Sequence, residues 1–477
     1  MIFTLTFLLN AGLNFALGLA VAGLLGPEEF GRYALAAAVA MLVNTLLFYW
    51  LWFSAARFYS ETVRSERPQV RATLDRLLAL LATVTVVAAV AVALWWTGGG
   101  MPGTLLALGI VGGLAHGLYD FAFTLARARF LDRVYVRLAV VRALVGFTLM
   151  LGAAVVWRDG AAVLAALIIS TAIALAFVGR SLSDAPLSAG RIDPALLRTF
   201  LRYSVPLIIG LVVYQAIPFL NRALIAASYG YAEMGRFSLA YDTISRIFFA
   251  LGSAFEFILF QIAVRADERE GRAAANAQLG RNVVIVLAVL LPAAAGFWMV
   301  LPAVAQTIVP LEFRDSFVSY STLLLPAVVA QAAITSALNG VFQIDKRTGP
   351  ALAAAALGLG VNVALALYLP RFVGPAGFAL AQVGGLGAAL ALSLVLSFRV
   401  LRLHVRLRDL AVVSAGVVAM VVVLAPWRDA LPALPTLLIG IPVGLACYGA
   451  VAVAGNVAGC RVYALRLLKR RRSQAAG

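Results

Sequence analysis

Residues 13–36 read LNFALGLAVAGLLGPEEFGRYALA, and residues 217–240 read IPFLNRALIAASYGYAEMGRFSLA. The two stretches align with an offset of 204, which superposes Gly26 on Gly230. Each contains the end of an apolar segment, a short turn with glycine and acidic residues, and the start of a second apolar segment. The chain is therefore predicted to consist of two related halves that begin with the same helix–turn–helix unit.

The composition is that of a membrane protein. Of the 477 residues, 63% are hydrophobic and 12% are charged, and a soluble protein of this size could not cover so apolar a surface with polar groups. About 20 apolar residues cross the hydrocarbon core of a bilayer. We predict fourteen membrane-spanning helices, at residues 3–25, 33–56, 77–97, 104–126, 138–157, 161–179, 203–226, 236–264, 282–305, 317–344, 350–369, 376–398, 410–425 and 435–457.

The repeat places six of these helices in each half, so both halves have the same orientation in the membrane. They are expected to be related by a pseudo-twofold axis along the membrane normal, with a central cleft between two six-helix lobes. The predicted fold is an all-α polytopic membrane protein. Its expected parts are an N-terminal lobe at 1–180, a cytoplasmic linker at 181–202, a C-terminal lobe at 203–400, an additional helix pair at 401–460 and a basic cytoplasmic tail at 461–477.

The positive charges indicate the orientation. Thirty of the 38 Lys and Arg are assigned to one set of alternate connections and the C-terminal tail, six to the other set, and two, Arg222 and Arg246, to apolar stretches. Basic residues flank membrane helices on the cytoplasmic side, so both termini are predicted to be cytoplasmic, in a bacterial inner membrane. The net charge of +17 does not favour nucleic-acid binding, because it lies in loops that face anionic membrane lipid.

Four stretches of the chain carry a family resemblance: GPEEFGRYALA at 26–36, SAARFYSE at 54–61, LNRALIAASYGYAEMGRFSLAYDTISR at 220–246 and LYLPRFVGPAGFALA at 367–381. They resemble the polysaccharide transporter family, the Wzx-type flippases within the multidrug/oligosaccharidyl-lipid/polysaccharide (MOP) exporter superfamily. Their order and spacing together are more specific than any single stretch.

The resemblance implies a flippase that moves an undecaprenyl-diphosphate-linked oligosaccharide from the cytoplasmic to the outer leaflet, by alternating access of two lobes. The product would serve the synthesis of a surface polysaccharide such as O-antigen or exopolysaccharide. The implied partners are the lipid-linked oligosaccharide, membrane lipid, and a polysaccharide polymerase or other biosynthesis proteins. No nucleic acid is expected among them.

Charged side chains inside predicted helices are the candidates for substrate contact, because a charge in hydrocarbon costs about 2.5 kcal/mol or more. Helical spacing places one polar stripe on a single face: Asp242, Arg246, Phe249, Ser253, Glu256 and Phe260. Arginine binds phosphate through bidentate hydrogen bonds, so Arg246 and Arg222 are the first candidates for the diphosphate. The competing interpretation is an Asp242–Arg246 ion pair that only stabilises the helix.

Other polar residues are weaker candidates. Asn10 and Asn14 share a face of the first helix and are suited to sugar hydroxyls or, alternatively, to helix–helix hydrogen bonds. Arg57 ends the second helix, either as a residue of the inner mouth or as a boundary charge. His116 and Asp120 lie one helical turn apart within 104–126, and the pair either relays protons that drive transport or satisfies itself within the membrane.

Two further function classes remain open alternatives. A multidrug or cation exporter of the same superfamily is expected to have acidic and aromatic cavity residues, whereas here arginines accompany the acids. A membrane glycosyltransferase or polymerase needs a catalytic loop or a carboxylate-and-metal site. The predicted outer loops are only a few residues long, and Cys447 and Cys460 have no metal-binding spacing. We therefore expect neither an enzyme nor a bound metal or cofactor.

The charge distribution makes a testable prediction about topology. A C-terminal alkaline phosphatase fusion should be inactive, and a C-terminal green fluorescent protein fusion should be bright, because both reporters would lie in the cytoplasm. An active phosphatase with a dark fluorescent protein would reverse the predicted orientation.

Overall fold

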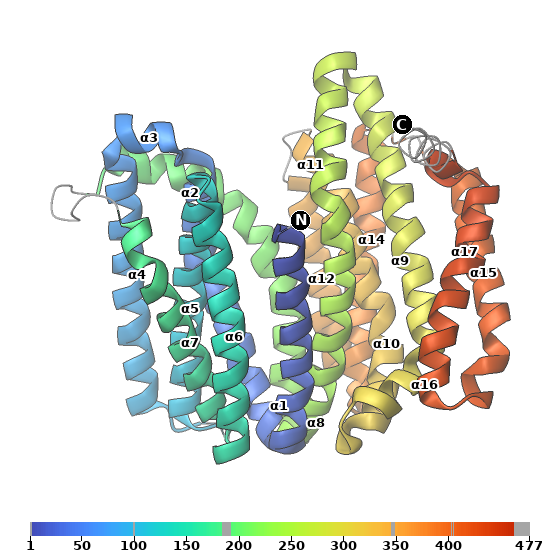
Figure 1. Ribbon diagram of the computed structural model, residues 1–477, viewed down its shortest axis with the longest axis horizontal. Helices are drawn as coiled ribbons and strands as arrows, with labels where there is room; N and C mark the ends of the chain where they lie inside the picture. Colours follow the sequence, from blue (N-terminus) through green and yellow to red (C-terminus); the bar gives the residue numbers. More distant parts are fainter. Residues whose placement is uncertain are drawn as a thin grey trace, which may run out of the picture. The chain divides into compact units, whose positions relative to one another are not determined.

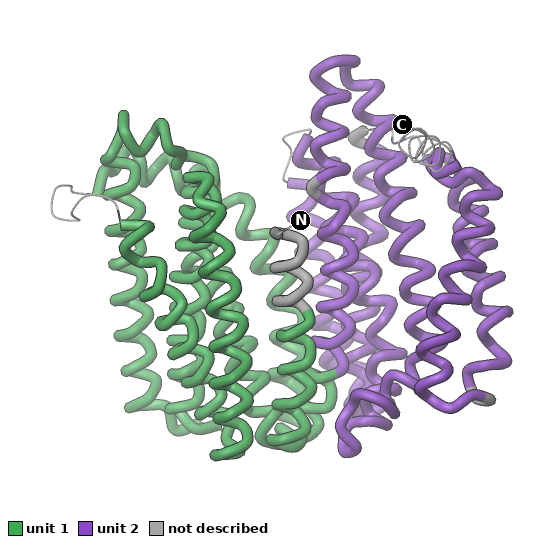
Figure 2. Tube along the Cα trace, viewed as in Figure 1, with its two compact units in different colours: residues 1–239 green, residues 240–477 purple. Residues whose placement is uncertain are grey.

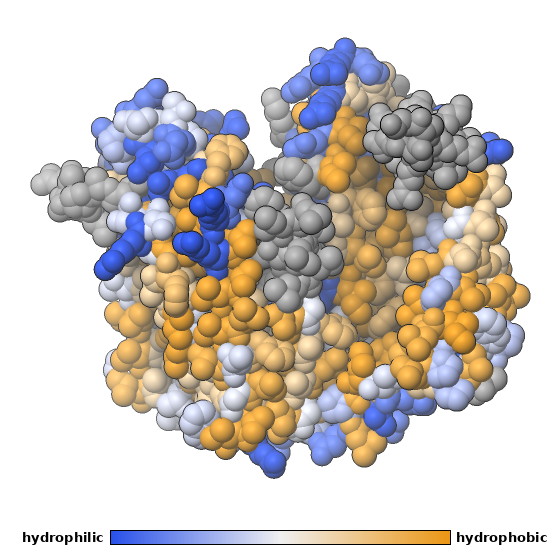
Figure 3. Space-filling view, viewed as in Figure 1, coloured by the Kyte–Doolittle hydropathy of each residue, from blue (hydrophilic) through white to orange (hydrophobic). Residues whose placement is uncertain are grey.

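The computed structural model describes residues 2–98, 101–183, 192–344, 349–401, 403 and 405–461. Over these residues the chain is helical and contains no β-strand (Figure 1), which confirms the predicted fold class. Lipid hydrocarbon offers no hydrogen-bond partners, and a helix satisfies its backbone groups within its own segment. In the view of Figure 3, apolar residues cover the middle of each unit and hydrophilic residues gather at its ends, as a bilayer requires.

The chain forms two compact units, residues 1–239 and 240–477 (Figure 2). The first contains α1 (Ile2–Val43), a π-helical turn (Asn44–Phe48), α2 (Tyr49–Phe58), α3 (Glu61–Glu66), α4 (Pro68–Trp95), α5 (Gly103–Ala128), α6 (Asp132–Trp157), α7 (Gly160–Leu182) and the first part of α8 (Pro194–Glu270). The predicted lobe and linker boundaries stay predictions. The predicted tail lies, beyond Arg461, outside the described residues.

The second unit contains the rest of α8 and the remaining helices. These are α9 (Arg272–Ile308), a 3₁₀ turn (Leu311–Phe313), α10 (Arg314–Ala333), a π-helical turn (Ile334–Leu338), α11 (Asn339–Ile344), α12 (Gly349–Tyr368), α13 (Pro370–Val373), α14 (Ala376–Leu401), α15 (Leu407–Ala430), α16 (Ala433–Pro435), a π-helical turn (Thr436–Gly440), α17 (Ile441–Ala454) and a 3₁₀ turn (Val457–Gly459).

Twelve helical stretches of the described residues are long and apolar enough to cross a membrane. Two of them run for 47 and 77 residues, far more than the roughly 20 needed for one crossing. Each is interrupted by a glycine outside the helical region: Gly26 has φ 72° and ψ 172°, and Gly230 has φ 86° and ψ 171°. Positive φ is readily accessible only to glycine. Dividing the two stretches at these glycines gives the fourteen predicted spans.

The turns after Gly26 and Gly230 pack against each other within the first unit. A Cβ atom on Gly31 would collide with the carbonyl oxygen of Tyr231, and one on Gly235 would collide with that of Pro27. These four residues are two pairs related by the same offset of 204. The contact is therefore reciprocal, as a local twofold axis between the two turns requires, and it depends on glycine at both positions.

Helix α5 packs closely on the segment from α1 into its π-helical turn. A Cβ atom on Gly109 would lie 2.6 Å from the carbonyl oxygen of Ala36, and one on Gly113 would lie 2.7 Å from the Val43 side chain. Gly117 faces the Phe48 ring in the same way. Small residues at this spacing let two helix backbones approach. The π-helical turn is thereby held directly against α5.

The reciprocal contact predicts that Gly31→Ala and Gly235→Ala each destabilise the protein by about 1–3 kcal/mol, as overpacking does. Thermal unfolding of the purified protein in detergent should show a lower midpoint for both variants. Gly210→Ala is the matched control, because a Cβ atom there has no neighbour within 4 Å. Unchanged midpoints for Gly31→Ala and Gly235→Ala would contradict the tight contact.

Candidate functional site

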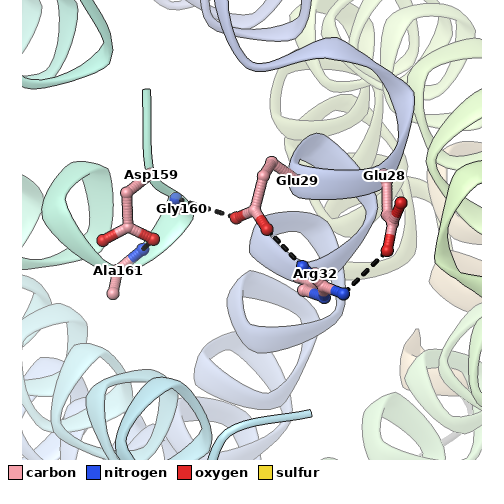
Figure 4. Close-up of polar contacts among 6 residues, drawn as sticks. All are labelled: Glu28, Glu29, Arg32, Asp159, Gly160 and Ala161. Atoms are coloured by element: carbon pink, nitrogen blue, oxygen red, sulfur yellow. Dashed lines mark hydrogen bonds and ion pairs between the residues drawn. The ribbon is translucent and has the colours of Figure 1, made fainter. Parts of the chain in front are cut away.

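Ion pairs and hydrogen bonds surround the first of the two turns (Figure 4). Arg32 forms ion pairs with Glu29 and, at 2.7 Å, with Glu28. Glu29 also accepts a hydrogen bond from the backbone N–H of Gly160 at 3.5 Å, while Asp159 caps the same end of α7. Carboxylates are stabilised at helix N-termini by the helix dipole. The turn is thus tied to α7 as well as to its own helix.

The second turn repeats part of this arrangement. Arg236 pairs with Glu233 at 3.1 Å, and the two residues are the counterparts of Arg32 and Glu29 at the offset of 204. Tyr231 adds a contact that its own counterpart, a proline, cannot make: the Arg32 guanidinium lies 5.6 Å from the Tyr231 ring centroid. The two turns therefore form a charged, closely packed region that holds the starts of the second and eighth predicted spans.

The predicted polar stripe lies on one face of α8, within the second unit. None of its members is buried: Arg246, Ser253 and Glu256 are exposed, and Asp242, Phe249 and Phe260 are half-buried. The opposite face is packed, since Ile244 and Phe248 are fully buried. The unit therefore keeps its charged face open. Charges on a membrane-spanning helix are accommodated where they face water or a charged ligand.

The two candidate arginines differ in environment. Arg222 lies in the part of α8 that belongs to the first unit and is only 6% exposed, beside the fully buried Asn221. Arg246 lies in the second unit with an exposed side chain. A ligand can reach Arg246 without displacing packed side chains, whereas Arg222 is part of the packed interior. Arg246 is therefore the stronger candidate for direct contact.

The remaining predicted residues lie elsewhere. Asn14 is exposed and borders a cavity of about 40 Å³ in the first unit that Arg142 and Ser170 also line. Arg57 is exposed in the last turn of α2. The side chain of Asn10 lies outside the described residues. The structure thus brings Asn14 together with an arginine that the sequence analysis did not single out.

Arg142 is that arginine, and its position corrects the charge count. The count above assigns it to the cytoplasmic connections, but it lies within α6, inside the predicted span 138–157. Apart from Arg236, which is the first residue of the span 236–264, three arginines of the described residues rather than two therefore lie within predicted spans, and the loop count falls to 29. The signal was present in the sequence, because Arg142 interrupts an apolar stretch just as Arg222 does.

Arg142 has partners on two neighbouring helices. Its Nη2 donates to Nδ1 of His116 at 3.0 Å, and its Nε donates to Oγ1 of Thr171 at 3.3 Å. Its guanidinium lies 4.1 Å from the centroid of the Tyr119 ring. Guanidinium has no acceptor, so Nδ1 of His116 must accept this bond. The imidazole is therefore neutral and carries its proton on Nε2.

Asp120 has a different partner. Its Oδ2 accepts a hydrogen bond of 2.9 Å from Nδ2 of Asn44, at the start of the π-helical turn. Asn44 is 1% exposed, and its Oδ1 has no hydrogen-bond partner among the described residues. His116 and Asp120 therefore belong to one cluster, but each is held by a residue on another helix. Asn44 was not predicted, although an asparagine within the apolar span 33–56 was a visible signal.

The comparisons with known proteins identify the architecture. A lipid II flippase MurJ in an inward closed conformation has 12% sequence identity, a TM-score of 0.72, and coverage of 95% of this chain and 98% of that chain. An inward-facing multidrug resistance MATE transporter of the MOP superfamily has 14% identity, a TM-score of 0.55, and coverage of 83% and 94%.

A Vibrio cholerae MATE transporter, VcmN, has 17% identity, a TM-score of 0.51, and coverage of 84% of this chain and 96% of that chain. No protein-family model matches the sequence, and no curated protein matches it in a sequence search. Identities this low establish similarity of fold alone. The chain is a multi-pass membrane protein with the fold of the MOP transporter superfamily, as the sequence resemblance predicts.

Proposed function

We propose that the protein is a flippase for a lipid-linked oligosaccharide carried on undecaprenyl diphosphate. It would move the head group from the cytoplasmic to the outer leaflet by alternating access, for synthesis of a surface polysaccharide such as O-antigen or exopolysaccharide. The single observation that carries this proposal is the open charged face of α8, with Arg246 exposed on a helix that crosses the membrane. Inner-membrane location with cytoplasmic termini belongs to the same proposal.

The chemistry of the substrate explains why this face is charged. A diphosphate head group needs cations and hydrogen-bond donors where the bilayer offers neither, and arginine supplies both in a fixed planar fork. Arg246 lies ten residues after Arg236 in the outer turn, which is about 15 Å along the helix and close to mid-bilayer. Arg246 would bind the diphosphate, and the polyprenyl tail would remain in lipid.

The acidic residues have a separate role in this proposal. Asp242 lies one helical turn before Arg246, where it can orient the guanidinium. Glu256 is exposed farther along the same face and would accept hydrogen bonds from sugar hydroxyls, as would Asn14 and Asn10. Arg57, exposed at the end of α2, would lie at the inner mouth. Arg222, which is packed within the first unit, remains the second candidate for the diphosphate.

A multidrug or cation exporter is the second candidate, and the similarity to MATE transporters supports it. A cationic substrate, however, would be repelled by the exposed Arg246, which an anionic diphosphate would neutralise. A membrane glycosyltransferase or polymerase is a weaker alternative, because the structural neighbours above are transporters. The proposed partners remain the lipid-linked oligosaccharide, membrane lipid and a polysaccharide polymerase.

Substitution of Arg246 tests the proposed diphosphate contact. Arg246→Ala should lower transport about ten- to a hundredfold, since hydrogen bonds to charged groups contribute about 1.5–3 kcal/mol. Surface polysaccharide should be lost while lipid-linked oligosaccharide accumulates on the inner leaflet. Arg246→Lys should restore only part of the transport, because ammonium lacks the bidentate fork.

Two controls separate this role from structural ones. Arg236→Ala removes an arginine of the outer turn on the same helix and should leave transport nearly unchanged, because such partly exposed ion pairs contribute little. The double substitution Asp242→Ala with Arg246→Ala should remain inactive. Recovery of transport in the double variant would show that the arginine only balances Asp242, and the substrate contact would be abandoned.

The open face of α8 is tested by cysteine labelling. In a background without Cys447 and Cys460, Ser253→Cys should react with a membrane-impermeant thiol reagent, because its side chain is exposed on the charged face. Ser245→Cys is the matched control on the same helix, where the native serine is only 6% exposed. An unreactive cysteine at position 253 would indicate that the face contacts lipid rather than water.

A further inference from the structure

We propose that Asp120 is a proton-binding site of the first unit, with Asn44 as the partner of its protonated form and Arg142 as the counter-ion of its carboxylate. The sequence analysis considered a relay between His116 and Asp120. The contacts instead assign the proton to Asp120 alone and give His116 the task of holding Arg142. That proton binding drives transport rests on the proposed function, whereas the proton site itself does not.

The hydrogen bond from Asn44 to Asp120 is one of the two that an amide and a carboxylic acid can exchange. Asn44 Nδ2 already donates to Asp120 Oδ2 at 2.9 Å, and Asn44 Oδ1 is a buried acceptor with no partner among the described residues. A protonated carboxyl group supplies the missing O–H donor, so the carboxylic acid and the amide can exchange two hydrogen bonds. A buried unsatisfied polar group costs about 1–3 kcal/mol. Protonation of Asp120 removes that cost.

Arg142 supplies the positive charge that balances the ionised carboxylate of Asp120. Its guanidinium lies over the ring of Tyr119, the residue before Asp120, and bonds to His116, one helical turn before Asp120, and to Thr171 on α7. These contacts hold the positive charge near the Asp120 carboxyl group. With Asp120 ionised the carboxylate and guanidinium cancel, and with Asp120 protonated one positive charge remains. A change of this kind inside a membrane alters how strongly the unit responds to the membrane potential.

The other titratable and charged groups around Asp120 leave this assignment unchanged. Tyr49 of α2 interacts with Asp120 electrostatically. His116 and Tyr119 lie on α5 itself, and Nδ1 of His116 already accepts from Arg142. On α4, Arg71 lies 5.9 Å from the centroid of the Phe121 ring, next to Asp120, and is paired with Asp75 at 2.7 Å. Asp120 is therefore the acid of the cluster that can take up a proton.

A cavity borders the arginine side of the cluster. The cavity of about 40 Å³ is bordered by Arg142, Asn14 and Ser170, and its volume is sufficient for one or more water molecules. In the transfer a hydronium ion gives its proton to the carboxylate and leaves as water. The step forms one O–H bond on Asp120 and breaks one on hydronium, with no other reactant.

The π-helical turn is the element that would respond. Asn44 begins the turn and Phe48 ends it against Gly117 of α5, so both ends of the irregular segment are held by α5. Single π-helical turns inside α-helices are frequent at functional sites. Leu46 in the middle points outward and lines an apolar groove of about 210 Å³ with Trp50 and with α8 between Val205 and Val213. The π-helical turn and α8 therefore line the same groove, which a rearrangement at Asn44 would reshape.

Infrared spectroscopy of the full-length protein in lipid nanodiscs tests the proton site directly, with the proton as the only ligand. A pH titration should reveal a protonated-carboxyl C=O band that Asp120→Asn abolishes. Arg142→Gln should shift the midpoint of that band upward by about one pH unit or more, because an opposite charge nearby favours the ionised form. Asn44→Ala should move the band to higher frequency, since the carbonyl loses its hydrogen bond.

The controls make each result decisive. Asp409→Asn removes a different carboxyl group, which is buried in α15, and should leave the band intact. Arg142→Lys keeps the positive charge and should shift the midpoint less than Arg142→Gln, which covers the case in which Arg142→Gln does not fold. The proposal would be overturned if the protonated-carboxyl band remained in Asp120→Asn. It would also be overturned if the titration midpoint did not depend on the charge at position 142.

Coupling to transport is measured separately, in liposomes that contain an undecaprenyl-diphosphate-linked oligosaccharide. A proton gradient should accelerate flipping by the unmodified protein, and Asp120→Asn should abolish the acceleration while flipping without a gradient remains. If Asp120 titrates but the protein does not flip this lipid, the proton site stands and the proposed substrate is rejected. A gradient response that persists in Asp120→Asn would reject the coupling.

Discussion

A charged side chain at the centre of a bilayer costs about 2.5–3.5 kcal/mol even on the most lenient scale, and the arrangement of this protein follows from that cost. Backbone polar groups satisfy themselves within helices. The Arg142 guanidinium lies over the Tyr119 ring and donates hydrogen bonds to His116 and Thr171. The charged stripe of α8 lies on a face of the helix that its unit leaves unburied. Arg142 is thus held by specific partners, whereas Arg246 is exposed where water or a ligand can reach it.

The same constraint distinguishes the two polar regions. Arg246 lies on an open face and suits an anionic substrate that arrives and leaves. The cluster of Asp120, Arg142 and His116 lies among α5, α6, α7 and the π-helical turn. The cavity beside it, of about 40 Å³, has room for water but not for an oligosaccharide, and the ligand that we propose for the cluster is a proton. The proposed substrate site and the proposed proton site belong to different compact units, and α8 contributes residues to both units.

Glycine determines how closely the two related turns approach. Gly26 and Gly230 adopt nearly the same backbone conformation, and Gly31 and Gly235 each face the carbonyl oxygen of the opposite turn. A side chain at either of the latter positions would separate the turns. The internal repeat therefore has a structural role, because it supplies two complementary surfaces whose contact requires glycine on both sides.

The sequence by itself determined the helical class, the fourteen spans and the repeat, because these depend on hydrophobicity and spacing along the chain. It also placed the α8 stripe on one face, since helical periodicity alone decides that. The partners of His116 and Asp120, the burial of Arg222 and the role of Asn44 were decided only by the tertiary structure. These features depend on which helices pack together and at what register, and a π-helical turn shifts that register in a way that regular 3.6-residue spacing cannot anticipate.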